Sequence, residues 1–505
     1  STSPEAPAEE KAVSENKLSW QQMKEEQAKK RKREAELKKV EARIEELETR
    51  DSEIDETMVL PDVCTNVAEC TKLSREKAAI AEELEELIDD PKVTGIGEMM
   101  NFPGVVSGDY DVLAKIQLGT SHGKIVDGHA PGLLGRDLDA YLVTGITNTH
   151  ECATLEEMRE NLRRGSYILI REGSAAKNLR TLLPGVTPGN ARRCAFCCDD
   201  RHIEDIVSDG HMDNHLRLAV GMGMDPVQAI TMCTLNAAEC FGLRNKGAIA
   251  PGRDADFILV DDLKAFRVRK VFTAGRLIAE DGRVLIPLDD AAAGAPSHSI
   301  HLKPLAEDAL SLPVRTGKAR VIGIEPASLV TKSLVREVKT DDAGCFQSAL
   351  NPGLTKIAVI ERHKRTGKLG IGILEGYGLT GGAIATTISH DSHNIVVAGD
   401  NDPDMLLAVR ELADMGGGIV SVHGGAIRRL PLPIAGLMTS ADPQEVNAVL
   451  HDMLVAARAE LGIPEDVEPF MTLSFMALPV IPELKLTARG LFNVNTFSFV
   501  GVEAD

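Results

Sequence analysis

Short apolar runs alternate with helical stretches between Pro91 and about residue 245, and this alternation constrains the fold more than any other feature. The strand-like stretch VDGHA precedes the helix-like RDLDAYLVT, and YILIREG precedes AAKNLRTLL. Strands that alternate with helices are typical of βα units on a parallel sheet. About five such units fit into residues 93–245, whereas a closed (β/α)8 barrel needs eight. The sequence therefore predicts an α/β fold with a partial barrel of about five strand–helix units.

Four side chains of the kinds that bind metals lie at the polar ends of these apolar runs. They are Glu98 in GIGEMMN, His129 in DGHAPG, His150 in NTHEC and Asp199 in CCDDRH. The runs before them are Val93–Ile96, Lys124–Val126, Gly145–Thr147 and Cys194–Cys198. Because the carboxyl ends of barrel strands meet at one face, we expect the four side chains to cluster. Carboxylates and imidazoles are the ligands of hydrolytic divalent-metal sites.

Each of these residues also has a purely structural interpretation. Glu98 could be a surface acid beside the turn 101–104, and His129 could be held by a backbone hydrogen bond. His150 and Glu151 could cap the helix that begins near Thr154, and Asp199 could cap a helix at Ile203. The joint placement of all four at strand ends favours the metal site.

One expected part of such a site is missing from the sequence. None of the 13 histidines stands two residues from another, so there is no His-x-His pair. Cys194–Cys197 forms a single CxxC without a second pair, which argues against a zinc ribbon. We therefore expect a metal site that lacks two of its imidazoles.

The composition bounds the partners and the compartment. A chain of 505 residues exceeds one core, so we expect two to four domains. The net charge of −20 argues against nonspecific binding to nucleic acid or anionic membranes. No apolar stretch reaches the roughly 20 residues of a membrane span. The nine cysteines follow no secreted disulfide pattern, and the sequence begins without a signal peptide, which predicts a cytoplasmic protein.

The region before Pro91 has a different character. Residues 1–16, rich in Ser, Pro, Ala and Glu, are predicted to be disordered. Residues 17–90 carry two heptad series, and residues 60–66 between them contain turn formers. The pattern predicts an antiparallel coiled-coil hairpin; two separate surface helices are the alternative. The series are Leu37, Val40, Ile44, Leu47, Asp51, Ile54, Met58 and Cys70, Leu73, Lys77, Ile80, Leu84, Leu87.

The heptad segment resembles the C-terminal coiled-coil hairpin of F-type ATP-binding-cassette proteins, through LSWQQMKEEQAKKRKREAELKKVEARIEELE and TKLSREKAAIAEELEELI. The chain contains no GxxxxGK[ST] phosphate loop, so no ATPase function follows from this resemblance. The hairpin would imply that the chain has a coiled-coil binding partner.

Three further segments follow the barrel region. Residues 246–285 are predicted to form short β-strands of a small β-domain, and residues 286–330 a linker with one or two elements. Residues 331–505 are predicted to form a C-terminal α/β domain, with strands such as KIAVIER and helices such as DPDMLLAVRELADM.

Residues 93–505 resemble bacterial-type adenine deaminases of the amidohydrolase superfamily. The resemblance rests on long contiguous stretches, among them GIGEMMNFPGV, VDGHAPGLLGRDLDAYLVTGI, RRCAFCCDDRHIEDI, ISHDSHNIVVAGDN and LPVIPELKLTARGLFNV. It implies a metal-dependent hydrolase that converts adenine to hypoxanthine and ammonia, and a homo-oligomer. His390–Asn394 (HDSHN) looks like a signature of the family's C-terminal domain.

The resemblance also implies roles for individual residues. Two metal ions, manganese or iron, would be bridged by Glu98 and bound by His129, His150 and Asp199. Asp199 would also carry the proton of the attacking water, and Glu151 would protonate a ring nitrogen. The base pocket would be lined by Arg171, Glu172, Ser174 and Asp200.

The chain departs from the family at its beginning. The family's N-terminal part supplies the first three barrel strands and the His-x-His ligands, and here the heptad segment stands in that place. Two hypotheses follow: an adenine deaminase with impaired activity, or a non-catalytic chimera whose hairpin is an interaction module.

Overall fold

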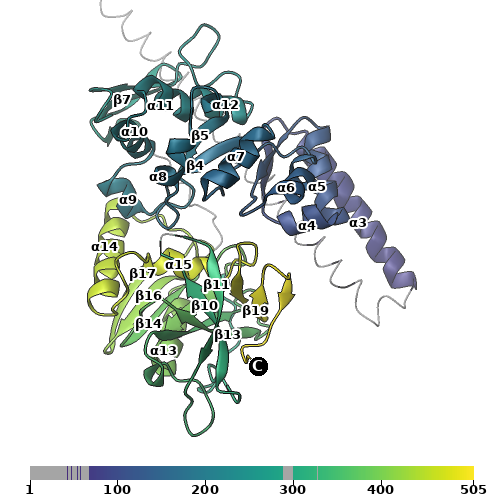
Figure 1. The fold of residues 1–505 in the computed structure, drawn as a ribbon, viewed down its shortest axis with the longest axis vertical. Helices are drawn as coiled ribbons and strands as arrows, with labels where there is room; N and C mark the ends of the chain where they lie inside the picture. Colours follow the sequence, from purple (N-terminus) through teal and green to yellow (C-terminus); the bar gives the residue numbers. More distant parts are fainter. Residues whose placement is uncertain are drawn as a thin grey trace, which may run out of the picture. The chain divides into compact units, whose positions relative to one another are not determined.

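The computed structural model describes residues 67–287, 299–326 and 328–504, and before them only Arg43, Leu47, Arg50, Ile54 and Thr57 (Figure 1). The predicted disordered segment 1–16 and the predicted turn at 60–66 lie outside the described residues. The chain divides into two compact units, Ser1–Gly97 with Leu113–Val126, and Glu98–Val112 with Asp127–Asp505.

The first unit contains the helix α3 (Val67–Ile88), which pairs with the helical positions before it. Leu47 and Ile54 are buried together with Leu73 and Ile80 of α3. Arg43 forms an ion pair with Glu83, and Arg50 with Glu76. From the first pair to the second, the residue number rises from 43 to 50 on one side and falls from 83 to 76 on the other. The two segments therefore run antiparallel. Antiparallel contacts are those expected of the predicted hairpin, which as a whole stays a prediction.

The barrel region supplies five consecutive strands, in two sheets. β1 (Gly95–Met99) pairs with β2 (Ile125–Gly128), and β3 (Asn148–Thr149), β4 (Tyr167–Arg171) and β5 (Cys194–Cys197) form a parallel sheet. Between β2 and β3 the backbone ladder is replaced by a hydrogen bond from the Gly128 N–H to the Asn148 side chain (2.8 Å). A Cβ at Gly128 would lie 1.9 Å from the Asn148 carbonyl oxygen, so only glycine fits there.

Helices connect and follow these strands. Their bounds are α4 (Phe102–Ser107), α5 (Tyr110–Ser121), α6 (Gly135–Leu142), α7 (Leu155–Arg163), α8 (Leu179–Leu182), α9 (Ile203–Ser208), α10 (Met212–Gly221), α11 (Pro226–Cys233) and α12 (Leu235–Cys240). An antiparallel sheet then follows, made of β6 (Phe257–Val260), β7 (Val268–Thr273), β8 (Arg276–Glu280) and β9 (Arg283–Val284). In the described ranges no helix is long and apolar enough to cross a membrane.

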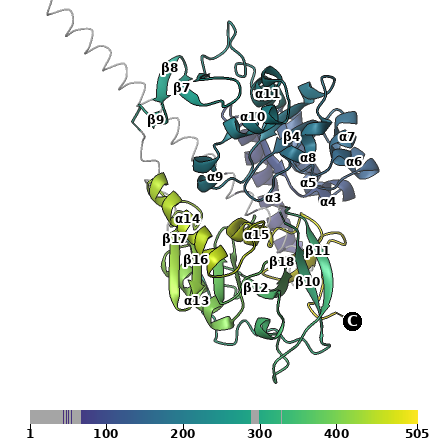
Figure 2. The same ribbon diagram turned by 60° about the vertical axis from the view of Figure 1, so that its left-hand side comes forward.

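The C-terminal region is built on an eight-stranded sheet of order β11-β10-β13-β12-β15-β14-β16-β17 (Figure 2). The strands are β10 (Lys318–Ile324), β11 (Thr331–Glu337), β12 (Leu354–Ile360), β13 (Leu369–Glu375), β14 (Gly382–Thr386), β15 (Ile395–Gly399), β16 (Gly418–His423) and β17 (Ala426–Pro431). A second small sheet contains β18 (Leu484–Thr487), β19 (Gly490–Asn493) and β20 (Ser498–Phe499).

Helices cover both faces of the large sheet because its strands are apolar on both sides. On β14, Ala383 and Ala385 pack with α13 (Asp402–Asp414), while Ile384 belongs to the core with α14 (Pro443–Ala459) and α15 (Pro469–Phe475). A strand buried on both faces is nearly continuously apolar, as β14 and β15 are.

The segment 286–330, predicted as a linker with one or two elements, contains a strand at its C-terminal end. β10 lies inside it and pairs with both β11 and β13, so the sheet begins at Lys318. Ala319, Val321 and Ile322 are fully buried there. The Asp, Ala, Pro and Ser clusters before this strand dominate the composition, so the sequence indicated an element in the linker without locating it.

Lys485 on β18 gives a prediction about stability. Its side chain is fully buried, and its amine donates to the Leu329 carbonyl (2.9 Å). Burial lowers the pKa of Lys485 from 10.5 to about 7. The unfolded chain binds this proton between pH 7 and about 10 and the folded chain does not, so stability falls as pH decreases through that window.

Lys485→Met is therefore expected to raise the free energy of unfolding at pH 6 by on the order of 2–4 kcal/mol. Most of the gain should be lost near pH 10, because the lysine is then neutral in the folded chain while the unfolded chain still binds most of the proton. Urea unfolding at the two pH values measures both. The control is Lys332→Met, which removes a half-exposed lysine paired with Glu325 and should change stability by less than about 1 kcal/mol. A destabilised Lys485→Met at pH 6 would contradict the argument.

Candidate metal centre

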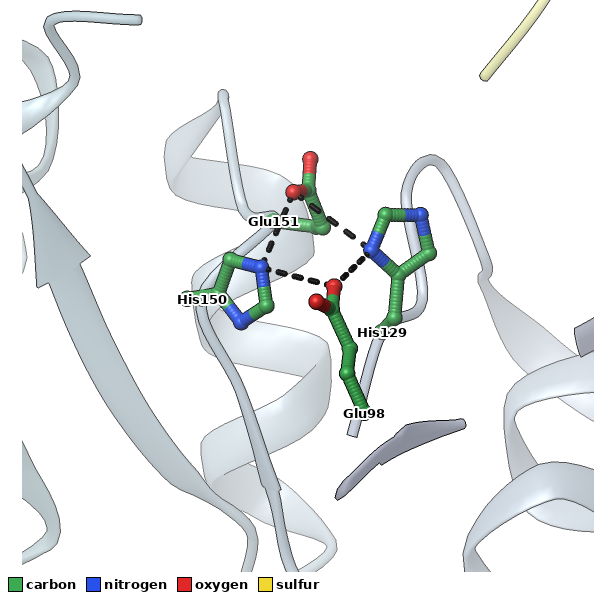
Figure 3. Close-up of side chains that lie close together, drawn as sticks. All are labelled: Glu98, His129, His150 and Glu151. Atoms are coloured by element: carbon green, nitrogen blue, oxygen red, sulfur yellow. Dashed lines mark hydrogen bonds and ion pairs between the residues drawn. The ribbon is translucent and has the colours of Figure 1, made fainter. Parts of the chain in front are cut away.

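Glu98 lies within β1, one residue before its end, and not beyond the strand as the sequence indicated. The turn after β1 is capped by another residue, because the Asn101 side chain accepts from the Gly104 N–H (3.0 Å) at the start of α4. Glu98 takes no part in that turn. Its carboxylate is directed toward the histidines that follow β2 and β3 (Figure 3).

His129 is the first residue after β2 and is buried. Its backbone N–H donates to the Tyr141 hydroxyl (2.8 Å), which in turn donates to the Met99 carbonyl (3.0 Å). Tyr141 on α6 therefore links the ends of β1 and β2. Its importance was missed from the sequence, where YLVTG gave only a helical pattern.

His150 and Glu151 directly follow β3, and neither caps the next helix. The cap of α7 is Thr154, whose hydroxyl accepts from the Glu157 N–H (3.2 Å), while the Glu157 carboxylate accepts from the Ala153 N–H (2.8 Å). This capping box satisfies the start of α7 without them. Both side chains are consequently free to point toward His129 and Glu98 (Figure 3).

Glu98, His129, His150 and Glu151 each offer one possible metal-ligand atom, and these four atoms lie within 4.8 Å of one another. An oxygen of Glu98 is 2.5 Å from His129 Nδ1 and 3.0 Å from His150 Nε2 (Figure 3). An oxygen of Glu151 is 3.2 Å from His150 Nε2 and 3.6 Å from His129 Nδ1. Three of the four predicted metal-binding residues are thus brought together, and Glu151 is the fourth member of the cluster.

Asp199 lies beside the cluster and is joined to it by Arg171. The Arg171 guanidinium, at the end of β4, donates to Glu151 (2.6 and 3.1 Å) and to Asp199 Oδ2 (2.6 Å). The same Asp199 oxygen is 3.9 Å from His150 Nε2. Asp199 does not cap α9, since the residue before that helix is His202 and no side chain caps it.

The other predicted pocket residues are dispersed. Glu172 is buried, but its carboxylate accepts from the Leu179 N–H (3.2 Å) at the start of α8. Ser174 donates to Asp205 and accepts from the His202 N–H (2.8 Å). Asp200 forms an ion pair with His390 of the C-terminal region (3.2 Å). Among the predicted pocket residues Arg171, Glu172, Ser174 and Asp200, Arg171 alone contacts the cluster directly.

Electrostatics favour two ionised carboxylates in the cluster. Burial opposes the charge on Glu98, but hydrogen bonds with His129 and His150 outweigh it and lower the pKa of Glu98 to about 2. Burial likewise opposes the charge on Glu151, yet Arg171 and the histidines hold its pKa below the usual range. Burial acts to lower the pKa of His150, and contacts with Glu151 and Glu98 raise it to about 10. The two carboxylates are thus ionised and face the positive charges of His150 and Arg171.

A divalent metal fits this donor set. Two carboxylates and two imidazoles from the ends of neighbouring strands converge on one point, and such ligands suit hydrolytic metals. The second ring nitrogen of His129, Nε2, is buried without a hydrogen-bond partner among the described residues. Its Nδ1, in contrast, faces both carboxylates.

A cavity of about 280 Å³ adjoins the cluster. Glu151 and Arg171 line one side, and Leu329, Pro482 and Asn495 of the C-terminal region line the other. The volume is near the lower end of the range for small-molecule sites. A small ligand in the cavity would therefore touch the cluster and both regions of this unit.

Comparison with known proteins identifies the class. A model described as the amidohydrolase family matches residues 38–278, and one for the adenine deaminase C-terminal domain matches residues 328–498. These matches and the candidate metal-binding cluster define an amidohydrolase-type hydrolase. The first match begins at residue 38, inside the segment 17–90 that we expected to be unrelated.

Sequence relatives identify the family within that class. The adenine deaminase of Nitratidesulfovibrio vulgaris strain Hildenborough is 59% identical over 423 residues, covering 84% of this chain and 73% of that protein. The adenine deaminase of Clostridium acetobutylicum is 44% identical over 454 residues, covering 88% and 80%. The adenine deaminase 2 of Desulfotalea psychrophila is 46% identical over 425 residues. The chain belongs to the adenine deaminase family.

Proposed function

We propose that the chain catalyses the hydrolytic deamination of adenine to hypoxanthine and ammonia at this cluster. The observation that carries the proposal is the convergence of Glu98, His129, His150 and Glu151 beside a small-molecule cavity. The identity of 59% to a protein named adenine deaminase supports adenine as the substrate.

The metal would be held by Glu98, His129 and His150, with Asp199 at the edge of the site. A bound divalent metal, manganese or iron, supplies Lewis acidity toward the attacking water. Asp199, with one oxygen on Arg171 and the other on the Asp200 N–H (2.9 Å), would take a proton from that water and deliver it to the leaving amine. Because Glu151 is ionised, it can protonate the base only after it has first received a proton.

The absence of a His-x-His pair leads to a prediction about rate. Without these imidazoles the second metal of a two-metal site has lost most of its protein ligands, so we expect turnover at least about 100-fold below that of the Nitratidesulfovibrio enzyme. Hypoxanthine release from adenine, with both proteins purified and loaded with Mn²⁺ or Fe²⁺, measures the difference. Equal turnover would show that the described cluster suffices.

The non-catalytic alternative has its own support in the antiparallel contacts of Arg43 with Glu83 and Arg50 with Glu76. It predicts metal binding without any release of hypoxanthine, together with a binding partner for the heptad segment. The cytoplasmic location and the homo-oligomer stay predictions from the sequence.

A further inference from the structure

The turn after β5 that carries Asp199 has a tightly constrained backbone. Asp199 has a φ of 55°, in the left-handed region that few residues other than glycine adopt. Its Oδ1 accepts from the Asp200 N–H (2.9 Å), and the Ser174 N–H donates to the Asp200 carbonyl (2.9 Å). The position of the Asp199 carboxylate therefore depends on where Asp200 is held.

The C-terminal region holds Asp200 from the opposite side. His390 Nε2 lies 3.2 Å from an Asp200 carboxylate oxygen, and the His390 ring stacks on Phe475 of α15 with centroids 4.4 Å apart at 17°. Phe475 also lines a small cavity together with Asp199 and Arg171. His390 is thus fixed between an aromatic ring and the turn that carries Asp199.

The loop that carries His390 is anchored from behind by Arg362. This arginine is almost completely buried, with no carboxylate partner among the described residues. It donates to the His393 carbonyl, to the Ala435 carbonyl (3.0 Å) and to Ser299 (3.1 Å). Burying an arginine without a carboxylate partner is costly, and its hydrogen bonds hold the loop that carries His390.

His390 is one of three histidine–carboxylate pairs between the same two segments. Asp200 pairs with His390, His202 with Glu468 (3.1 Å), and Glu204 with His451 (2.6 Å). The last pair is the most exposed, since 61% of the His451 side chain is accessible to solvent. Only the His390 pair includes a residue adjacent to Asp199.

We propose that His390 is a positioning residue for the active site, contributed by the C-terminal region. His390 fixes the side chain of Asp200, and the backbone N–H of Asp200 orients the Asp199 carboxylate. The adenine deaminase C-terminal domain would then be part of the catalytic apparatus. This inference rests on the proposed role of Asp199, but the position of the turn can be tested without any activity.

The test compares His390→Gln with His451→Gln by hydrogen exchange in the full chain. In His390→Gln the amides of Ser174 and Asp200 should exchange about 10-fold faster, because their hydrogen bonds lose the support of the ion pair. In His451→Gln these amides should exchange as in the unaltered chain, because an exposed pair contributes little. Equal exchange in both variants would overturn the proposal.

Metal binding and kinetics extend the test. The Kd for Mn²⁺ should rise about 10-fold in His390→Gln, and kcat should fall 10- to 100-fold with KM unchanged, as for residues that orient metal ligands. If His390→Gln does not fold, Asp200→Asn is the second variant, because it breaks the same ion pair from the other side. It should show the same faster exchange of the Ser174 and Asp200 amides. A further outcome is faster amide exchange in His390→Gln while neither the unaltered chain nor any variant turns over adenine. That outcome would support the positioning role of His390 and contradict only the proposed substrate.

Discussion

Replacing Asp199 by asparagine is expected to reduce adenine turnover by about 10²- to 10⁴-fold and to leave the fold intact. Asparagine keeps the size of the side chain, and its single carbonyl oxygen can still accept from either Arg171 or the Asp200 N–H, which bind different oxygens of Asp199. It cannot accept the proton of the attacking water or pass it to the leaving amine. Single-turnover measurements of hypoxanthine release, with enzyme in excess, make slow rates visible.

The matched control is Asp209→Asn, which removes a half-exposed carboxylate at the end of α9. Asp209 lies 3.7 Å from Arg201 and contacts none of the cluster residues, so turnover should stay within about twofold of the unaltered chain. If Asp199→Asn retained more than a tenth of the activity, proton transfer would have to be assigned to another group, with Glu151 as the first candidate.

The parts of the site that follow from strand order could be predicted from the sequence. His129 and His150 lie directly after β2 and β3. The alternation of apolar strands and polar strand ends in the sequence had predicted these positions. Glu151 was assigned next to the metal ligands, whereas the structure places its carboxylate among them. Sequence spacing shows which residues leave a strand end but not which of two neighbouring side chains turns inward.

Contacts between segments far apart in the sequence could not be predicted in this way. Arg171 was expected to line a base pocket, yet its guanidinium forms an ion pair with both Glu151 and Asp199. No local pattern encodes that geometry, because the two carboxylates follow different strands. The contact of His390 with Asp200 joins residues 190 positions apart, and only the structure places it at the turn.

The fold shows the same division between local and long-range information. The apolar strands β12 and β14 to β16 and the amphipathic helix α13 have clear local signals. β10 was not located within the predicted linker because its strand signal, KARVIGI, follows a long polar stretch. Its pairing with β13 crosses about 50 residues of chain, and that pairing buries it. Tertiary contacts, more than local propensity, decide such a strand.

Replacing Glu98 by glutamine is expected to weaken Mn²⁺ binding by about 100-fold or more. Glu98 is the residue closest to both imidazoles, and its negative charge offsets the charge of the bound ion. Mn²⁺ at about 100 times its Kd should raise the free energy of unfolding of the unaltered chain by roughly 2.7 kcal/mol. In Glu98→Gln the same concentration should raise it by only about 0.4 kcal/mol or less.

Glu172→Gln is the control for that experiment, because it changes a buried carboxyl of the same region whose partner is the Leu179 N–H and not the cluster. Isothermal titration with Mn²⁺ and thermal unfolding with and without the metal give the two measurements. Unchanged affinity in Glu98→Gln would mean that His129, His150 and Glu151 alone hold the ion. In that case Glu98, the most exposed member of the cluster with a third of its side chain accessible, would face the substrate and not the metal.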